Sequence, residues 1–288
     1  MMIWMRYWGY KMEVLFNELS LYGQYRDCGD FIHRGLKPFL KVTTEMKQLS
    51  VELLKKCDTW NCKVTGSQTL NDIIRSKARK MDELRKLKLD FASLIKTPFW
   101  DIKTFQNSDS VYILSGEEIA GTSLAEACCR GCTVVSFGDS PVSCNPLLVY
   151  KDEQEVSLHN FTKSGELSDL LWQNKEISFE QYLKAFFHQT RLDFSKVLSK
   201  YTFDNVDNSD YGTYIGTLKR FCEMHWDDIY KDRGLDYKKY NRSLAIKDCP
   251  DETYKFRVSQ KMRCHGYRKD DKFVVLAFES DHKLSDKG

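Results

Sequence analysis

A short strand–helix–strand pattern in the middle of the chain constrains the fold most. Residues 110–114 alternate as a half-buried strand does, and Ser123–Arg130 is typical of a short helix. Gly131 follows, and glycine commonly ends helices because it adopts left-handed backbone angles. The β-branched run at 133–137 (T-V-V-S-F) then predicts a buried strand. We therefore expect a mixed α/β fold, in which helices pack on a small sheet.

Helical periodicity is found on both sides of this pattern. Apolar residues recur at helical spacing over residues 69–95, and Pro98 stops that segment. Another helix is predicted from Asp30 to about residue 54, in two pieces because Pro38 interrupts it. Residues 180–201 are predicted to form an aromatic-rich amphipathic helix.

The last part of the chain has a different organisation. Helices are predicted at 213–231 and 235–244. Three strands follow, at 254–258, 262–267 and 273–278, with Asp270 and Asp271 in the turn between the last two. The region thus has the order α-α-β-β-β.

The polar, acidic segment 204–210 has the composition of a linker and sets the predicted domain boundary. We expect a main α/β domain over residues 12–205 and a basic C-terminal α+β region over residues 206–288. Residues 1–11 are expected to be an extension or the result of an alternative start, because Met12 opens the first recognisable strand.

Composition indicates a soluble protein of the reducing cytoplasm. The ten cysteines among 288 residues are too few for a disulfide scaffold, and no stretch approaches the roughly 20 apolar residues that a membrane-spanning helix needs. No secretory signal is visible. Charged residues make up 30% of the chain but its net charge is only +3, so a nucleic-acid surface must come from local charge. No cofactor is expected.

The strongest local signal is basic and aromatic interleaving between Tyr254 and Lys272. Seven Lys and Arg residues face only two Asp residues there, which leaves a local net charge of +5. Lys and Arg on a twisted sheet can neutralise successive phosphates, and neighbouring aromatic rings can stack on bases. An ordinary sheet edge protected by charged residues is the other interpretation of this segment.

Three short segments resemble the RelE/HigB type of bacterial ribonuclease toxin. They are K-F-R-V-S at 255–259, K-M-R-C-H-G-Y at 261–267 and F-V-V-L-A-F-E-S-D-H-K at 273–283. The resemblance implies that basic sheet residues contact the RNA backbone and that an acidic or His residue near the last strand assists proton transfer. The first strand of that fold is not evident ahead of Thr213. The matching positions are Arg257, Arg263, His265, Asp281, His282 and Lys283.

A second resemblance spans most of the chain. F-N-E-L-S-L at 16–21, P-F-W-D at 98–101, S-L-A-E-A at 123–127 and V-S-F at 135–137 are similar to elements of an uncharacterised bacterial family. That family also has a basic, β-rich C-terminus and is loosely linked to phage-defence islands. It implies a partner protein, such as an ATPase or an antitoxin. This chain has no G-x-x-x-x-G-K-[S/T] loop, so it is not expected to be the ATPase itself.

Two metal sites are alternatives. Carboxylates at predicted strand ends or turns are the ligands that Mg²⁺-dependent nucleases use, and they occur here at Glu18, Asp101, Glu117, Glu118, Glu126 and Asp139. A structural zinc would use Cys128, Cys129, Cys132 and Cys144, although only one C-x-x-C pair is present.

The preferred hypothesis is an RNA-directed protein, most concretely a metal-independent endoribonuclease of toxin or phage-defence type that acts on ribosomal or transfer RNA. General acid–base catalysis is assigned to His265, His282 and Asp281. Binding of the RNA backbone is assigned to Lys255, Arg257, Lys261, Arg263, Arg268, Lys269 and Lys283. The rival hypothesis is a non-catalytic subunit that binds a partner protein in a defence complex.

Overall fold

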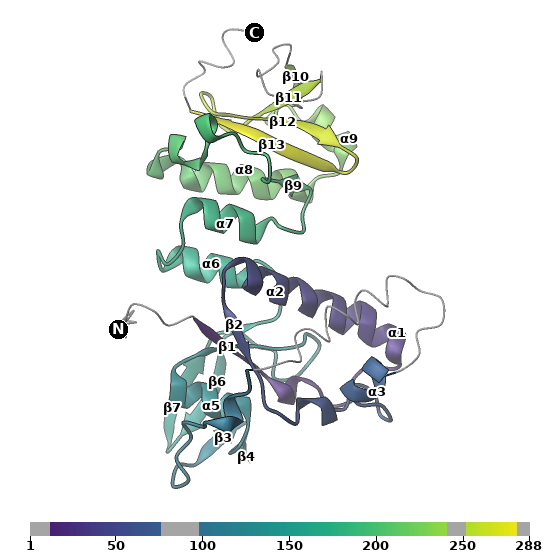
Figure 1. Ribbon diagram of the computed structural model, residues 1–288, viewed down its shortest axis with the longest axis vertical. Coiled ribbons are helices and arrows are strands. Elements are labelled where there is room, and N and C mark those ends of the chain that lie inside the picture. The colour runs from purple at the N-terminus through teal and green to yellow at the C-terminus, as the bar shows by residue number, and fades with distance from the viewer. Residues whose placement is uncertain (1–11, 76–97, 241–251, 281–288) are drawn as a thin grey trace. The chain divides into compact units, whose positions relative to one another are not determined.

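The computed structural model describes residues 12–75, 98–240 and 252–280, and the chain forms two compact units, residues 1–170 and 171–288 (Figure 1). In the described residues the first unit contains two sheets and the second contains one. Helices and strands are mixed in both units. The α/β class predicted from the sequence is therefore confirmed.

A parallel sheet forms the centre of the first unit. Its order is β2-β1-β5-β8, and every neighbouring pair is parallel. The strands are β1 (Glu13–Phe16), β2 (Glu52–Leu54), β5 (Thr133–Val135) and β8 (Asn160–Phe161). The two central strands are almost completely buried, as strands covered on both faces are, which explains their unbroken apolar sequences. The buried strand predicted at 133–137 is confirmed as β5.

An antiparallel sheet of order β4-β3-β6-β7 completes the first unit. Its strands are β3 (Tyr112–Leu114), β4 (Glu117–Glu118), β6 (Leu147–Lys151) and β7 (Gln154–Leu158). One face of this sheet packs against α5 (Ser123–Arg130) around Leu124 and Val149. Thr122 caps the start of α5 and Gly131 ends it with φ 63°, so the predicted helix and its glycine cap are confirmed.

The first helical segment of this unit is continuous. It runs from α1 (Cys28–Asp30) through π-helical residues Phe31–Leu36 into α2 (Lys37–Gln48). The predicted break is absent, and Pro38 lies just after the π-helical turn Phe31–Leu36, where the backbone hydrogen bonds change spacing. Asp27 rather than Asp30 caps this segment. The predicted helix end near residue 54 is also wrong, since β2 occupies that position. The helix predicted at 69–95 begins as α3 (Leu70–Arg75), and its remainder lies outside the described residues.

The second unit contains a five-stranded sheet of order β10-β11-β12-β13-β9. The three strands predicted near the C-terminus are confirmed as β11 (Thr253–Arg257), β12 (Arg263–Lys269) and β13 (Lys272–Glu279). β9 (Leu192–Asp193) pairs in parallel with β13, and β10 (Lys238–Tyr240) lies where part of a second short helix was predicted. From β10 to β13, each strand is antiparallel to its neighbour.

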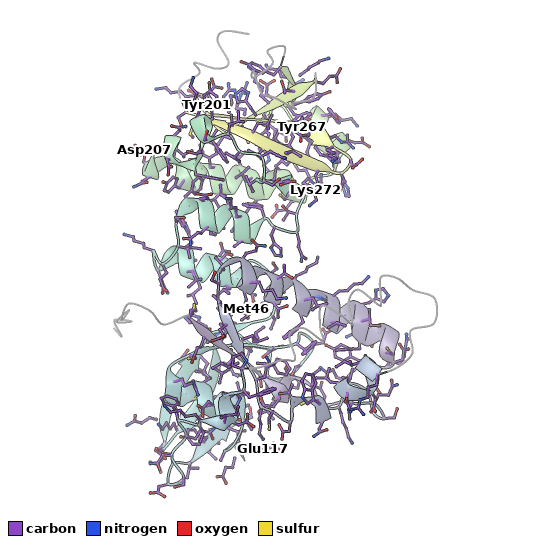
Figure 2. All side chains as sticks on the ribbon, in the orientation of Figure 1. Met46, Glu117, Tyr201, Asp207, Tyr267 and Lys272 are labelled. Carbon is purple, nitrogen blue, oxygen red and sulfur yellow. The ribbon has the colours of Figure 1, made fainter. Side chains whose placement is uncertain are left out.

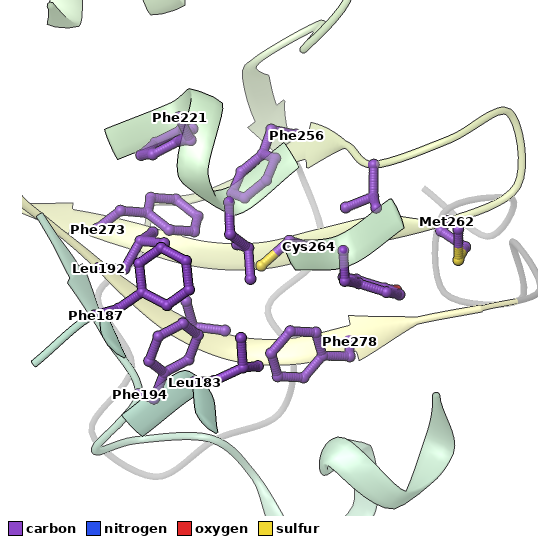
Figure 3. Close-up of a cluster of buried hydrophobic side chains, with 14 of the residues drawn as sticks. Leu183, Phe187, Leu192, Phe194, Phe221, Phe256, Met262, Cys264, Phe273 and Phe278 are labelled. Atoms are coloured by element: carbon purple, nitrogen blue, oxygen red, sulfur yellow. The ribbon is translucent and has the colours of Figure 1, made fainter. Parts of the chain in front are cut away.

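Three helices contribute aromatic side chains to the core of this unit. They are α7 (Phe179–Phe186), α8 (Tyr211–Glu223) and α9 (Trp226–Lys231). Figure 3 shows Phe221 beside Phe256 and Phe273, with Cys264 and Phe278 further along the same face of the sheet. The helix predicted at 180–201 ends at Phe186, and its second half instead contains β9 and a 3-10 helix at Ser199–Tyr201. α6 (Glu166–Gln173) precedes α7 along the chain.

The boundary of the compact units differs from the predicted domain boundary. Along the chain, the boundary falls between Leu170 and Leu171 rather than between Asn205 and Val206. The predicted linker is part of the second core, where Phe203 is 5% and Val206 is 3% exposed. Short 3-10 helices at Phe203–Asn205 and Asn208–Asp210 give this acidic sequence a fixed backbone.

No helix in the described residues has both the length and the apolar character needed to cross a lipid bilayer.

The position of Phe203 in the core leads to a stability prediction. Phe203→Ala should lower the free energy of unfolding of the second unit by ~3 kcal/mol, as expected for a buried aromatic side chain. Asp204→Ala, at the adjacent exposed residue, is the control and should change the free energy of unfolding by less than ~0.5 kcal/mol. Chemical denaturation followed by circular dichroism measures both. Equal, small effects would contradict the packing of Phe203, directly before the predicted linker, into the second core.

Candidate nucleic-acid interface

The predicted site residues of the C-terminal sheet lie on both of its faces. On β11 and β12, Phe256 and Cys264 face the helices. Because side chains alternate along a strand, their neighbours lie on the opposite face. Cross-strand register places Lys255 opposite His265 and Arg257 opposite Arg263 on that face. The strands thus bring together four of the predicted residues.

His265 is fully buried. Its Nε2 lies 2.8 Å from Oε2 of Glu279, and its ring meets that of Tyr240 edge to face. Nδ1 has no hydrogen-bond partner in the described part of the chain. A ring enclosed in this way does not reach an RNA backbone, so direct acid–base catalysis by His265 has no support from this geometry.

Arg263 is only 8% exposed. Its Nη1 donates to the carbonyl oxygens of Ser259 (2.6 Å), Met262 (2.8 Å) and Gln260 (3.3 Å). The guanidinium therefore holds the turn between β11 and β12. The prediction that this side chain lies on an exposed sheet surface is wrong, because its donors are used by the backbone of its own turn.

The other two residues of this face are partly exposed. Arg257 pairs with Asp236 at 3.1 Å, and Lys255 lies over the ring of Tyr240, 5.0 Å from its centroid. Burial lowers the pKa of Lys255, although the Glu279 carboxylate opposes this effect. Lys261, in the turn, is exposed. Of the predicted RNA contacts on this side of the sheet, only these three reach solvent.

A second group of residues surrounds Arg268 near the turn between β12 and β13. The guanidinium of Arg268 stacks on the ring of Trp226, 4.2 Å from its centroid, and donates to the hydroxyl of Tyr230 at 3.2 Å. Its Nε donates to the carbonyl of Asp270 at 2.9 Å. Trp226 is itself fixed, because its Nε1 donates to Asp271 Oδ1 at 2.8 Å. Lys269 follows and is exposed.

Aromatic rings extend this group across α9 and β11. Tyr230 packs edge to face on Tyr237, which stacks on Tyr254 with 5.1 Å between centroids. Tyr230 remains 48% exposed. We call these residues the arginine–aromatic cluster: Trp226, Tyr230, Tyr237, Tyr254 and Arg268.

Sequence reasoning identified Arg268 but missed three of its aromatic partners. Trp226 and Tyr230 are four residues apart on α9, a spacing that places them on one helix face and could have indicated the cluster. Tyr237 joins the cluster only through tertiary packing, so no sequence pattern indicated it. The remaining predicted residues, Asp281, His282 and Lys283, lie outside the described residues.

Three of the carboxylates considered as magnesium ligands bind other groups, and Glu117 and Glu118 are exposed. Asp101 accepts from the backbone N–H of Cys57, Asp139 pairs with Arg34 at 3.0 Å, and Glu126 pairs with Arg130 at 2.7 Å. Across the residues that the structure describes, no three His, Cys, Asp or Glu side chains are grouped as a metal site requires.

Three of the cysteines considered as zinc ligands are half-buried, and the described residues group none of them as a metal site requires. Burial raises the pKa of the Cys128 thiol to about 12 and that of Cys132 to about 11. Cys129 Sγ lies 2.9 Å from the hydroxyl of Tyr112, and Cys144 is exposed. Every described cysteine is a free thiol. This arrangement gives no support to the zinc alternative.

One acidic side chain in the first unit has an unusual environment. Glu18, directly after β1, is 9% exposed and accepts a hydrogen bond from Ser123 N at 2.8 Å through Oε1. Its Oε2 has no hydrogen-bond partner among the described residues. Burial raises the pKa of this carboxyl, and the Ser123 hydrogen bond opposes that rise. Glu18 thus holds the N-terminus of α5 at an energetic cost.

Comparisons with known proteins return nothing: no family model, no curated protein and no solved structure matches this chain.

The contacts of Arg263 predict its effect on stability. Arg263→Ala should destabilise the second unit by ~1–3 kcal/mol, because the buried Met262 carbonyl and two partly buried turn carbonyls lose their donor. Arg257→Ala removes a partly exposed ion pair and should cost at most ~1 kcal/mol. Urea denaturation of the two variants and the wild type gives the comparison. Equal costs would contradict the structural role of Arg263.

The raised pKa of Glu18 predicts a pH effect. When a carboxyl binds its proton more tightly in the folded state, the folded protein loses stability as pH rises. The loss begins near the ordinary pKa of 4.5 and continues up to the folded pKa. Glu18→Gln removes this loss, so its stability relative to wild type should increase between about pH 4.5 and pH 7. Glu117→Gln, at an exposed position, should run parallel to wild type. Thermal melts across this pH range test the difference, and a Glu18→Gln curve parallel to wild type would contradict the prediction.

Proposed function

We propose that the second unit binds RNA and that the chain is an RNA-directed protein, of the ribonuclease toxin or phage-defence type. The arginine–aromatic cluster carries this proposal. Arg268 is held in place by Trp226 and Tyr230, and a guanidinium fixed in this way binds phosphate with little further loss of entropy. The exposed ring of Tyr230 beside it offers a surface on which a base can stack.

One exposed lysine adjoins the cluster. Lys239 lies opposite Tyr254 across β10 and β11. Lys269 and Lys272 flank the turn after Arg268, but alternation directs their side chains to the opposite face of the sheet. Lys239 pairs with Glu252 at 2.6 Å, so part of its charge is balanced. Positive charge next to aromatic rings is the combination that single-stranded nucleic acid binds without strong sequence preference. This supports RNA binding at the cluster rather than on the opposite face around His265.

The order of elements in the second unit gives independent support. β9 precedes α8 and α9 and pairs with β13, so a strand stands ahead of the two helices. The RelE/HigB fold, which the C-terminal segments resemble, places its first strand in that position. The strand was not evident in the sequence because it is only two residues long.

Cleavage is the finer part of the proposal. A base must remove the proton of the RNA 2′-hydroxyl, cations must stabilise the charged phosphorane, and an acid must protonate the leaving oxygen. With His265 buried against Glu279, we assign the acid–base role to His282 and Asp281.

RNA binding is tested by salt dependence. Arg268→Gln should lower the slope of log affinity against log salt concentration by ~0.7 for a single-stranded RNA, since one phosphate contact is lost. Tyr230→Ala should weaken binding by ~1–3 kcal/mol through lost stacking and leave the slope unchanged. Fluorescence anisotropy with a labelled oligonucleotide measures both. Arg26→Gln, at a side chain 83% exposed in the first unit, is the matched control. Equal slopes for Arg268→Gln and wild type would contradict RNA binding at this cluster.

Cleavage is tested separately with a chelator present. His282→Ala should retain RNA binding and slow cleavage by ~10²-fold or more, the usual contribution of a general acid or base. His159→Ala, at an exposed position of the first unit, should cleave as wild type does. If the His282 variant cleaves at the wild-type rate, that residue has no catalytic role. If wild type cleaves no RNA, the chain is an RNA-binding subunit instead.

A further inference from the structure

The antiparallel sheet of the first unit has one face that α5 does not cover. Alternation along β3 and β6 buries Tyr112, Leu147 and Val149 against α5. The intervening side chains therefore point away from the core. Among them Tyr150 is 44% and Leu148 is 43% exposed, and Val111 at the end of the same face is 49% exposed. These are large apolar side chains in contact with water.

The register of the four strands arranges this face in a row. Ile113 on β3 lies opposite Glu118 on β4 and also opposite Tyr150 on β6, and Tyr150 lies opposite Glu155 on β7. The row therefore reads Glu118, Ile113, Tyr150, Glu155, with an apolar pair between two carboxylates. The hydroxyl of Tyr150 donates to Glu155 Oε2 at 3.1 Å, which fixes the position of the ring.

A shallow hollow of about 660 Å³ lies beside the centre of this row, between Val111, Ile113, Tyr150, Asp152 and Glu153. Both acids in its lining are exposed. The nearby lysine, Lys151, is turned to the other face, where its Nζ lies over the ring of Tyr112 and 3.7 Å from Cys129 Sγ. Glu117, labelled in Figure 2, adds a further exposed carboxylate at the β4 edge. We call the whole surface the acidic–apolar face: Val111, Ile113, Glu118, Leu148, Tyr150, Asp152, Glu153 and Glu155.

The apolar centre and acidic rim of this face indicate what kind of partner it binds. An apolar centre with a charged rim is the composition of a protein-binding surface, in which the centre supplies affinity and the rim supplies orientation and on-rate. The rim here is acidic on both sides and at one end, so it repels RNA and attracts cations. We propose that the acidic–apolar face binds a partner protein through a basic amphipathic segment, whose apolar side chains cover Tyr150 and Ile113 and whose Lys or Arg side chains meet Glu118 and Glu155. This proposal is independent of RNA binding by the second unit.

Two synthetic peptides of equal length provide the probes. Both carry leucine and valine at alternating positions, and the remaining positions are lysine in one peptide and glutamate in the other. The lysine peptide should bind the full chain at least ~10-fold more tightly than the glutamate peptide, and its affinity should fall as salt is raised from 50 to 300 mM, by the screening of rim charges. Fluorescence anisotropy of the labelled peptides measures both affinities.

Variants locate the binding on this face. Tyr150→Ser should weaken binding of the lysine peptide about 10-fold, whereas Tyr22→Ser, at a tyrosine 54% exposed elsewhere in the first unit, should not. The double variant Glu118→Lys/Glu155→Lys should lose the lysine peptide and gain the glutamate peptide. Glu180→Lys, at an exposed glutamate of the second unit, should leave both affinities unchanged.

Three outcomes would overturn the proposal. The first is no binding of the lysine peptide at low salt. The second is equal binding of that peptide by wild type and by the double variant, which would place it on another surface. The third is self-association of the chain in sedimentation experiments that disappears in Tyr150→Ser, which would make a second copy of the chain the occupant of this face.

Discussion

The second unit depends on a close approach between Gly266 and Phe273. A Cβ atom at Gly266 would lie 2.2 Å from the carbonyl oxygen of Val274 and 2.7 Å from the Phe273 ring, so no larger residue fits. Beside this point β13 has one extra residue, Leu276, because Gly266 pairs with Val275 while His265 pairs with Ala277. The bulge allows Phe273, Val275 and Phe278 to face the helices together. β12 keeps its regular alternation, so Cys264, Gly266 and Arg268 share that face. The first two lie at the core and the third reaches Trp226.

The two units differ in the local charge of their surfaces, a difference that the net charge of +3 for the whole chain does not show. The second unit has a fixed guanidinium on an aromatic surface, and the first unit has exposed apolar side chains between carboxylates. On electrostatic grounds we expect a phosphate backbone to be attracted to the former and repelled by the latter. Both hypotheses drawn from the sequence, RNA binding and binding of a partner protein, therefore have a surface with suitable chemistry, on different units. They need not exclude each other.

Local sequence patterns predicted much of the fold but little of the site. Strands β5, β11, β12 and β13 and helix α5 were found because each has a clear period and a clear end. β9 was missed because its alternating T-R-L-D-F sequence lies inside a longer helical pattern, and only its pairing with β13 makes it a strand. Arg263 and His265 are two residues apart, so alternation along β12 places them on one face. It could not show that this face buries both, because burial depends on the rest of the chain. Trp226 and Arg268 are far apart in sequence, so their contact follows from the tertiary fold alone.

The buried acids of the first unit explain why carboxylates at strand ends gave a misleading signal for metal. Glu45 is fully buried, and its two oxygens accept from Gly165 N, from the backbone and hydroxyl of Ser168, and from Ser164, at the start of α6. Glu126 accepts from Thr104 and Phe105 N, and Glu18 accepts from Ser123 N at the start of α5. A helix start has unpaired N–H groups and a partial positive charge, so a buried carboxylate there replaces the water that these groups would otherwise bind. Oxygens committed in this way are not available to Mg²⁺. Glu18 thus holds the start of α5 and Glu45 that of α6, whereas Glu126 holds the loop at Thr104 and Phe105. Acidic residues in this unit therefore have structural contacts, and their number in the sequence says little about catalysis.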